Sequence, residues 1–137
     1  MKKHKKRIYL AGPILGCSTG EARVWRNDVK KVFEPDCECL DPMVYSSSDD
    51  PAETIVRNDL ELIRKSDIIL ANMWKLGPGT TMELAYAKVY GVPVVLVGAE
   101  EFKASPWFAH HATLAWCGDL KGGMAHVLNW LIEQGDN

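Results

Sequence analysis

Apolar residues follow two different periods along the chain, and these periods alternate. Short, nearly continuous apolar runs predict buried strands at 8–11, 37–40, 67–71, in the run that ends at Val97, and at 114–117. Segments with apolar residues every three or four positions predict helices at 21–33, at 52–65, after Thr80, after Ser105 and at 124–133. Proline punctuates this pattern: Pro35 ends one predicted helix, and Pro106 takes the favoured first position of another.

The alternation of strands and helices indicates the fold class. Strands separated by helices favour a parallel sheet with right-handed crossovers. We therefore predict an α/β fold, a three-layer, doubly wound (flavodoxin/Rossmann-like) domain with a parallel sheet of about five strands. The run 8–11 is expected at the centre of the sheet. No repeat or long linker divides the 137 residues, so 1–137 are expected to form a single domain, with 1–7 as a basic, solvated tail.

A glycine-containing loop between two predicted strands marks the first candidate site. Gly77, Pro78 and Gly79 predict a turn, and Thr80 is expected to cap the next helix. Sites in such sheets lie beyond the carboxyl ends of strands, so Glu83 is a candidate functional residue. Spacing alone leaves two interpretations open. Glu83 fits a structural capping box that starts at Thr80, or a carboxylate that the helix N-terminus holds ionised as a nucleophile.

Four segments in order resemble the nucleoside 2-deoxyribosyltransferase family, including its branch of nucleoside 5′-monophosphate N-glycosidases: IYLAGP at 8–13, RNDL at 57–60, SDIILAN at 66–72 and GPGTTMELAYA at 77–87. The resemblance implies that Glu83 is the nucleophile that takes the deoxyribosyl group. It also implies that Asp59 assists proton transfer at the nucleobase and that Tyr9 orients the nucleophile by a hydrogen bond. From the residues alone, Asp59 fits a solvated or capping carboxylate, and Tyr9 fits a core aromatic.

Two further loops are candidates for substrate contact. Gly12 and Pro13 open a loop of small residues at the end of the first strand, where a ligand can approach the backbone closely. The resemblance implies that the loop at 41–51 lies over the nucleobase, which makes Asp41, Met43 and Tyr45 candidates for base contact. A half-buried loop aromatic is an equally good interpretation of Tyr45.

Position 77 departs from the family pattern, which usually has an acidic residue where this chain has Gly77. The departure leaves room for a phosphate, and Gly77, Gly79, Thr80 and the helix N-terminus together could bind an anion. The resemblance also implies that Ser105 contacts the sugar or phosphate in the site of a neighbouring subunit.

Bulk properties restrict the possible partners. A net charge of −2 gives no general attraction to nucleic acid polymers or anionic membranes. No apolar run approaches the roughly 20 residues that span a bilayer, and the basic start runs directly into a strand rather than a signal peptide. We expect a cytoplasmic protein with reduced thiols at Cys17, Cys37, Cys39 and Cys117.

No metal or organic cofactor is expected. The cysteine spacing does not fit a structural zinc site. His110 and His111 are adjacent, and neighbouring helical residues point about 100° apart, which makes a poor chelating pair.

These observations favour an enzyme that transfers a 2-deoxyribosyl group between nucleobases through a sugar ester on Glu83. A nucleoside 5′-monophosphate N-glycosidase is the alternative, and a non-catalytic nucleotide-binding sensor is an alternative of another class. The expected partners are a deoxynucleoside or deoxynucleotide and a nucleobase. We also expect a homo-oligomer with sites near the subunit interfaces, because aromatic and apolar residues are frequent between Phe102 and Trp116.

Overall fold

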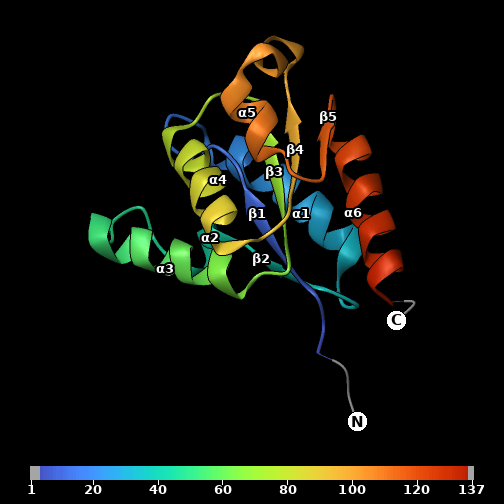
Figure 1. Cartoon of the computed structure of the whole chain (residues 1–137). Helices are drawn as coiled ribbons and strands as arrows, with labels where there is room; N and C mark the ends of the chain where they lie inside the picture. The colour runs from blue at the N-terminus through green and yellow to red at the C-terminus, as the bar shows by residue number, and fades with distance from the viewer. Residues whose placement is uncertain (1–3, 136–137) are drawn as a thin grey trace.

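The computed structural model describes residues 4–135, in which five strands form one parallel sheet in the order β2-β1-β3-β4-β5 (Figure 1). The strands are β1 (Arg7–Ala11), β2 (Glu38–Leu40), β3 (Ile68–Met73), β4 (Val94–Gly98) and β5 (Ala115–Cys117). This arrangement confirms the predicted α/β fold with a five-stranded, flavodoxin-like parallel sheet. The expectation that 8–11 forms the central strand was wrong: β3 is central, because the chain adds β2 on one side of β1 and all later strands on the other.

The described chain has six α-helices and one 3-10 helix between and after the strands. They are α1 (Thr19–Phe33), α2 (Pro42–Tyr45), α3 (Ala52–Lys65), α4 (Pro78–Tyr90), η1 (Glu100–Ala104), α5 (Pro106–His111) and α6 (Leu120–Gly135). Helix α3 has the predicted bounds. Helix α2 lies in a segment that was expected to be a loop. The short helix forms because Asp41 accepts a hydrogen bond from the Met43 N–H and so caps its first turn.

Helix α6 begins several residues before its predicted start at residue 124, and it contains the glycine pair that was expected to precede it. A Cβ atom at Gly123 would lie 2.4 Å from Cγ2 of Val97. The helix therefore packs directly on β4 at Gly123. Glycine is needed there because the two backbones approach closely, and not because the chain turns.

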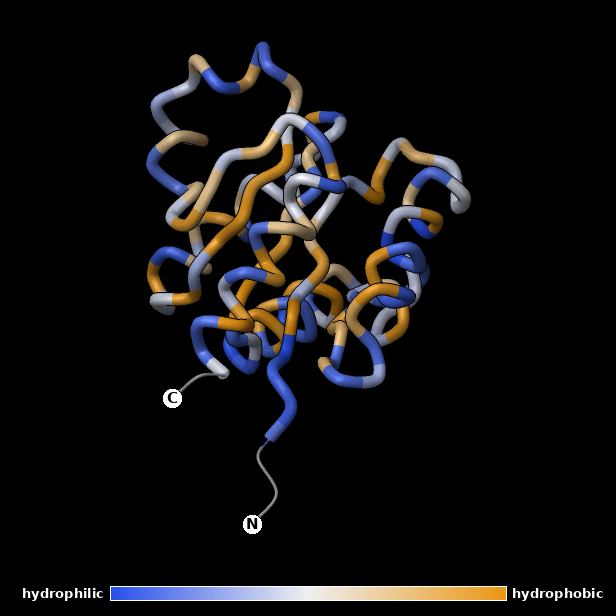
Figure 2. Tube along the Cα trace, turned by 90° about the vertical axis from the view of Figure 1, so that its right-hand side faces the viewer, coloured by the Kyte–Doolittle hydropathy of each residue, from blue (hydrophilic) through white to orange (hydrophobic). Residues whose placement is uncertain are grey.

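Alternating strand residues divide the core into two apolar clusters, one on each face of the sheet. Ile8 and Leu10 of β1 pack toward α1 and α6, whereas Tyr9 and Ala11 pack toward the side covered by α3, α4 and α5 (Figure 1). Figure 2 shows the hydrophilic N-terminal segment passing into the hydrophobic strands. The face that Tyr9 occupies is the one on which the candidate site is built.

The strand order places a topological switch point between β1 and β3, since β1 is followed in sequence by β2 on its other edge. In open α/β sheets, ligands bind beyond the carboxyl ends of the strands at such a point. Within residues 4–135, no helix is both long and apolar enough to cross a membrane. The four cysteines are free thiols.

Candidate active site

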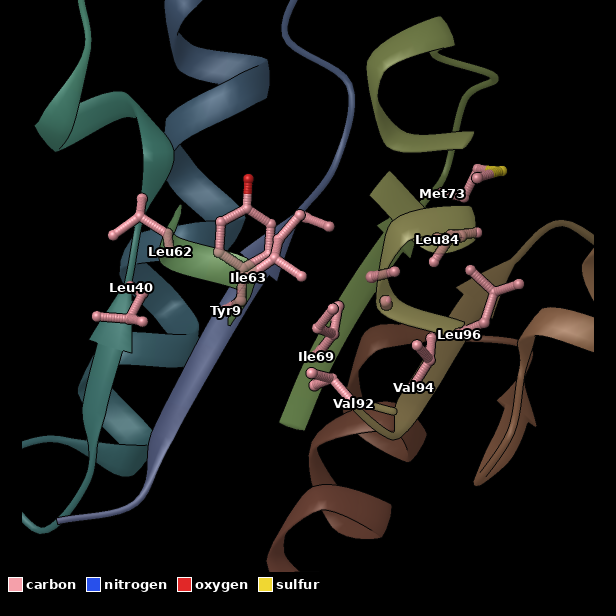
Figure 3. Packing of buried hydrophobic residues seen from close by; sticks show 13 residues of the cluster. Tyr9, Leu40, Leu62, Ile63, Ile69, Met73, Leu84, Val92, Val94 and Leu96 are labelled. Carbon is pink, nitrogen blue, oxygen red and sulfur yellow. The ribbon is translucent and has the colours of Figure 1, made fainter. Parts of the chain in front are cut away.

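Three ionisable side chains from three elements meet beyond the carboxyl end of β1. The hydroxyl of Tyr9 donates a hydrogen bond to Oε2 of Glu83 on α4. Asp59 on α3 is close enough to interact electrostatically with both groups. Figure 3 shows the Tyr9 hydroxyl pointing out of the apolar cluster, past Leu62 and Ile63. The structure thus brings the three residues proposed as catalytic into one place.

The expectation that Thr80 caps α4 was wrong, and with it the capping-box interpretation of Glu83. Helix α4 begins at Pro78 with the extended residue Gly77 at the N-cap, and no side chain caps it. Thr80 is a buried residue inside the first turn, and Glu83 lies in the second turn, too far along to bond the cap residue. Because Pro78 has no N–H and a fixed φ, it starts the helix without needing a capping side chain. The capping box is thereby removed as an explanation of Glu83.

Burial is the main influence on the pKa of both carboxyls, and at Glu83 it opposes the ionisation that was expected from the helix start. Burial raises the pKa of Glu83 from 4.5 to about 8, although the Tyr9 hydrogen bond lowers it. Burial likewise raises the pKa of Asp59 from 3.8 to about 6. Between about pH 6 and pH 8, the pair therefore holds one proton.

Two atoms of this cluster make it a candidate ligand site. Oδ1 of Asp59 is buried and has no hydrogen-bond partner within the described chain. Burial also raises the pKa of the Tyr9 hydroxyl well above its usual range, so this hydroxyl stays a donor. Buried polar atoms are normally satisfied, and an orphaned carboxylate oxygen beside a raised-pKa carboxyl is typical of a functional site.

Arg26 is a site residue that the sequence reasoning missed. It is fully buried, and its guanidinium donates to the backbone oxygens of Ala22 at 2.6 Å and Gly12 at 3.0 Å. It also lies 4.5 Å from the ring centroid of Trp25. Its positive charge lowers the pKa values of Glu83 and Asp59. The available signal was its position on the apolar face of α1, four residues after Ala22.

Asp41 holds Arg26 in place. Its carboxylate is buried, with Oδ2 2.7 Å from the Lys30 ammonium and Oδ1 3.6 Å from Nε of Arg26. Oδ1 also accepts the Met43 N–H at 2.9 Å. Arg26 in turn donates to the Met43 sulfur at 3.7 Å. With both oxygens engaged, Asp41 acts as a structural anchor, and its predicted base contact stays a prediction.

The loop after β1 and the loop before α4 pack against each other through Pro13 and Gly77. A Cβ at Gly12 would lie 2.5 Å from the Trp25 indole, so only a glycine leaves room for the indole to pack here. A Cβ at Gly77 would lie 3.2 Å from Pro13, so these residues seat the two loops together. By contrast, a Cβ at Gly79 would have nothing within 4 Å. Of the three glycines, Gly79 has the open space that a ligand would need.

Two further residues predicted to contact substrate, Tyr45 and Ser105, lie on the short helix α2 and at the start of α5. Tyr45 ends α2 and is half exposed. Ser105 occupies the N-cap position of α5, but its side chain makes no capping hydrogen bond, contrary to the expected cap. Nδ1 of His111 lies 2.6 Å from the Trp107 carbonyl oxygen, and its ring stacks on the Trp107 ring. In the described part of the chain, no three His, Cys, Asp or Glu side chains gather to hold a metal.

The chain is similar to known proteins in both sequence and fold. The family model described as "Nucleoside 2-deoxyribosyltransferase like" matches residues 5–101. No curated protein matches the chain. A conserved protein from Enterococcus faecalis V583 has a similar structure, with a TM-score of 0.74 at 13% identity, covering 92% of this chain and 99% of that chain.

Two structures of named enzymes are also similar. A 2-deoxyribosyltransferase from Bacillus psychrosaccharolyticus has a TM-score of 0.64 at 21% identity, covering 85% of this chain and 88% of its own. The CMP N-glycosidase of Clostridium botulinum has a TM-score of 0.62 at 18% identity, covering 91% and 99%. These likenesses concern the fold, whereas the family model matches most of the sequence. The chain therefore belongs to the nucleoside 2-deoxyribosyltransferase-like family.

Proposed function

We propose that this protein cleaves the N-glycosidic bond of a deoxynucleoside, carries the 2-deoxyribosyl group as an ester on Glu83, and transfers it to a second nucleobase. The observation that carries the proposal is the hydrogen bond from Tyr9 to Glu83 beside the orphaned carboxylate oxygen of Asp59. Cleavage through a sugar ester needs a nucleophile, a group that orients it, and an acid near the leaving base. Family membership supports the substrate class.

The proposed reaction has two displacements at C1′. In the first, a Glu83 carboxylate oxygen attacks C1′ opposite the base, the C1′–N bond breaks, and its electron pair leaves with the base. Asp59 gives the departing base its proton. In the second, a nitrogen of the incoming base attacks C1′, the ester bond to Glu83 breaks, and Asp59 takes up the released proton. Two inversions give net retention at C1′.

This cycle needs one proton on the carboxyl pair, and that proton has to be on Asp59 when Glu83 attacks. The pair holds one proton between about pH 6 and pH 8. The hydrogen bond from Tyr9 favours the ionised form of Glu83. Positive charge that develops on the sugar in the transition state favours the same form further.

A nucleoside 5′-monophosphate N-glycosidase is the second candidate, with water in place of the incoming base. The first turn of α4 supports it, because this N-terminus has no capping side chain and open space at Gly79. Unbonded N–H groups at a helix start favour an anion such as a 5′-phosphate. The structural likeness to a CMP N-glycosidase agrees with this candidate.

Product chromatography separates the candidates. The protein is incubated with each deoxynucleoside or each deoxynucleoside monophosphate, with and without a different free base, and ribonucleosides serve as the matched control. Exchange of the base only when the second base is present would support transfer. Release of base from the monophosphates without an acceptor would support the glycosidase. Binding of deoxynucleosides and monophosphates without release of any base would overturn both candidates in favour of a sensor.

A further inference from the structure

A group of exposed apolar side chains lies at the carboxyl ends of β1 and β3, next to the candidate active site. Ile14 and Leu15 lie in the loop that follows β1, and Trp74 and Leu76 lie in the connection from β3 to α4. All four side chains are between 40% and 80% exposed. We call these four residues the apolar rim. Large apolar side chains that stay exposed beside a candidate site commonly line the place where a ligand binds.

The fold holds the apolar rim at the same strand ends as the two carboxyls. Strands β1 and β3 are parallel neighbours, with Ala11 opposite Ala71, so the chain leaves both strands at the same edge of the sheet. Figure 1 shows the blue loop after β1 beside the yellow-green loop before α4. The second loop enters α4 at Pro78, and this helix carries Glu83. The rim and the proposed nucleophile therefore share one continuous segment, 74–83.

Two contacts hold the loops of the rim together. The Lys75 ammonium donates a hydrogen bond to the backbone oxygen of Gly16 at 2.9 Å. Gly16 has a φ of 77°, a left-handed conformation that favours glycine. A Cβ at Gly77 would lie 3.2 Å from Pro13, so the loops are also closely packed there. The rim is thus ordered before a ligand binds, which lowers the entropy cost of binding.

The rim offers a surface for stacking and little for hydrogen bonding. Of the side chains at 12–16 and 74–79, only that of Lys75 is polar, and its ammonium already donates to Gly16. Asp41, from which a base contact was expected, has both carboxylate oxygens engaged. Trp74 is the one aromatic residue of the two segments. An indole suits a nucleobase, because every base has a flat π face and stacking on an aromatic side chain contributes to binding.

We propose that the nucleobase stacks on Trp74, and that the apolar rim selects bases by ring area rather than by hydrogen bonds. This inference rests on the proposed function, because it concerns the base of the same substrate. A purine overlaps more of an indole than a pyrimidine does, so purine deoxynucleosides should bind more tightly. Trp74 then positions the base whose bond to C1′ breaks at Glu83.

The variants Trp74→Ala and Trp74→Phe test the stacking surface. Chromatography follows the release of base from deoxyadenosine and from thymidine over a range of substrate concentrations. Trp74→Ala should raise the KM for deoxyadenosine by on the order of tenfold or more and that for thymidine by less. Its kcat should stay near that of the parent, because stacking binds the substrate and the transition state alike. Trp74→Phe keeps an aromatic face and should recover most of the loss.

The matched control is Trp107→Ala on α5, since Trp107 is also exposed but lies outside the rim. This variant should keep the KM values of the parent. Circular dichroism should show that every variant is folded. Equal KM values for Trp74→Ala and the parent would overturn the stacking role. A parent that binds thymidine as tightly as deoxyadenosine would overturn selection by ring area.

A binding measurement separates this inference from the proposed function. Free adenine should quench the tryptophan fluorescence of the parent, and Trp74→Phe should lose most of this quenching, whether or not the protein cleaves a nucleoside. A parent that releases no base from any deoxynucleoside would overturn the proposed function, and the quenching would still decide the role of Trp74. A parent that adenine does not quench, or full quenching that persists in Trp74→Phe, would overturn the stacking role.

Discussion

Two buried ionisable clusters flank the carboxyl end of β1, and they differ in how their charges are balanced. In the first, Arg26 and Lys30 surround the carboxylate of Asp41, and both of its oxygens have partners. In the second, Glu83 and Asp59 are carboxyls whose ionised forms repel each other, and one oxygen of Asp59 has no hydrogen-bond partner. The first cluster meets the usual rule for buried charges, and the second violates it.

The balanced cluster explains how the unbalanced one is tolerated. Arg26 donates to the backbone oxygen of Gly12 just after β1, so it fixes the end of the strand that carries Tyr9. Its positive charge opposes the rise in pKa at Glu83 and Asp59. A network whose hydrogen bonds are satisfied therefore lies beside a group whose bonds are not, which is the pattern expected where function has overridden local stability.

The largest expected effect comes from Glu83→Gln. Glutamine keeps the shape and helix propensity of glutamate, but a neutral amide is a far poorer nucleophile. Base release should fall by on the order of 10³-fold or more. Quenched time points analysed by chromatography measure this rate, and Glu101→Gln, at an exposed position in η1, is the matched control. A Glu83→Gln protein that releases base at near the parent rate would remove Glu83 from the chemistry.

Glu83→Gln should also remove the loss of folding stability that Glu83 causes as pH rises. Unfolded Glu83 loses its proton near pH 4.5, and folded Glu83 loses it near pH 8. Between these values the folded chain holds the extra proton, so parent stability falls as pH rises, by about 1.4 kcal/mol per pH unit for one such group. Glu83→Gln lacks this loss and should be the more stable protein at pH 8.5 in urea unfolding.

The next largest expected effect is a loss of folding stability in Arg26→Met, which changes the balanced cluster. Methionine fills much of the volume but leaves the Gly12 oxygen and the Asp41 charge with fewer partners. Removing one member of a buried ion pair destabilises by about 3–5 kcal/mol. Urea unfolding should show this loss, whereas Arg23→Met, exposed on the same helix, should stay within about 0.5 kcal/mol of the parent. Equal stability of the two variants would show that Arg26 does not anchor the loop.

A smaller effect is expected from Asp59→Asn, and it concerns the pH profile. The parent should lose activity below about pH 6, where both carboxyls are protonated, and above about pH 8, where neither is. The variant should be slower by on the order of 10²-fold and should keep only the acid limb, because its remaining carboxyl must be ionised. An alkaline limb that persists in Asp59→Asn would assign the acid role to another group.

The fold could be predicted from the sequence because hydrophobic periodicity is local information. The continuous apolar run at 8–11 indicates a strand buried on both faces, and the helical period of 52–65 indicates a helix buried on one side. The prediction of where α4 starts was wrong for a local reason as well. A threonine followed three residues later by a glutamate satisfies the capping pattern, but Pro78 had already begun the helix.

The site was predictable only in part. The position of Glu83 after the glycine loop made it a candidate, and the resemblance added Tyr9 and Asp59; the structure brings the three together. The raised pKa values were not predictable, because they depend on burial by elements distant in sequence. Arg26 was missed for a related reason: its partners at Gly12 and Asp41 are 14 and 15 residues away along the chain, and periodicity does not report such contacts.

The smallest expected effect is that of Tyr9→Phe, which separates the orienting hydroxyl from the packing of the ring. Phenylalanine keeps the apolar contacts of Tyr9, so the free energy of unfolding should change by about 1 kcal/mol or less. The hydrogen bond lowers the pKa of Glu83, so its loss should move the acid limb of the pH profile to higher pH. The rate near neutral pH should then fall by on the order of 10-fold, with recovery as pH rises. Tyr86→Phe, an exposed tyrosine on α4, is the matched control. A Tyr9→Phe profile with its acid limb unmoved would mean that the hydroxyl does not tune Glu83, and the contrast between the two clusters would then rest on burial and on the charges of Arg26 and Asp59.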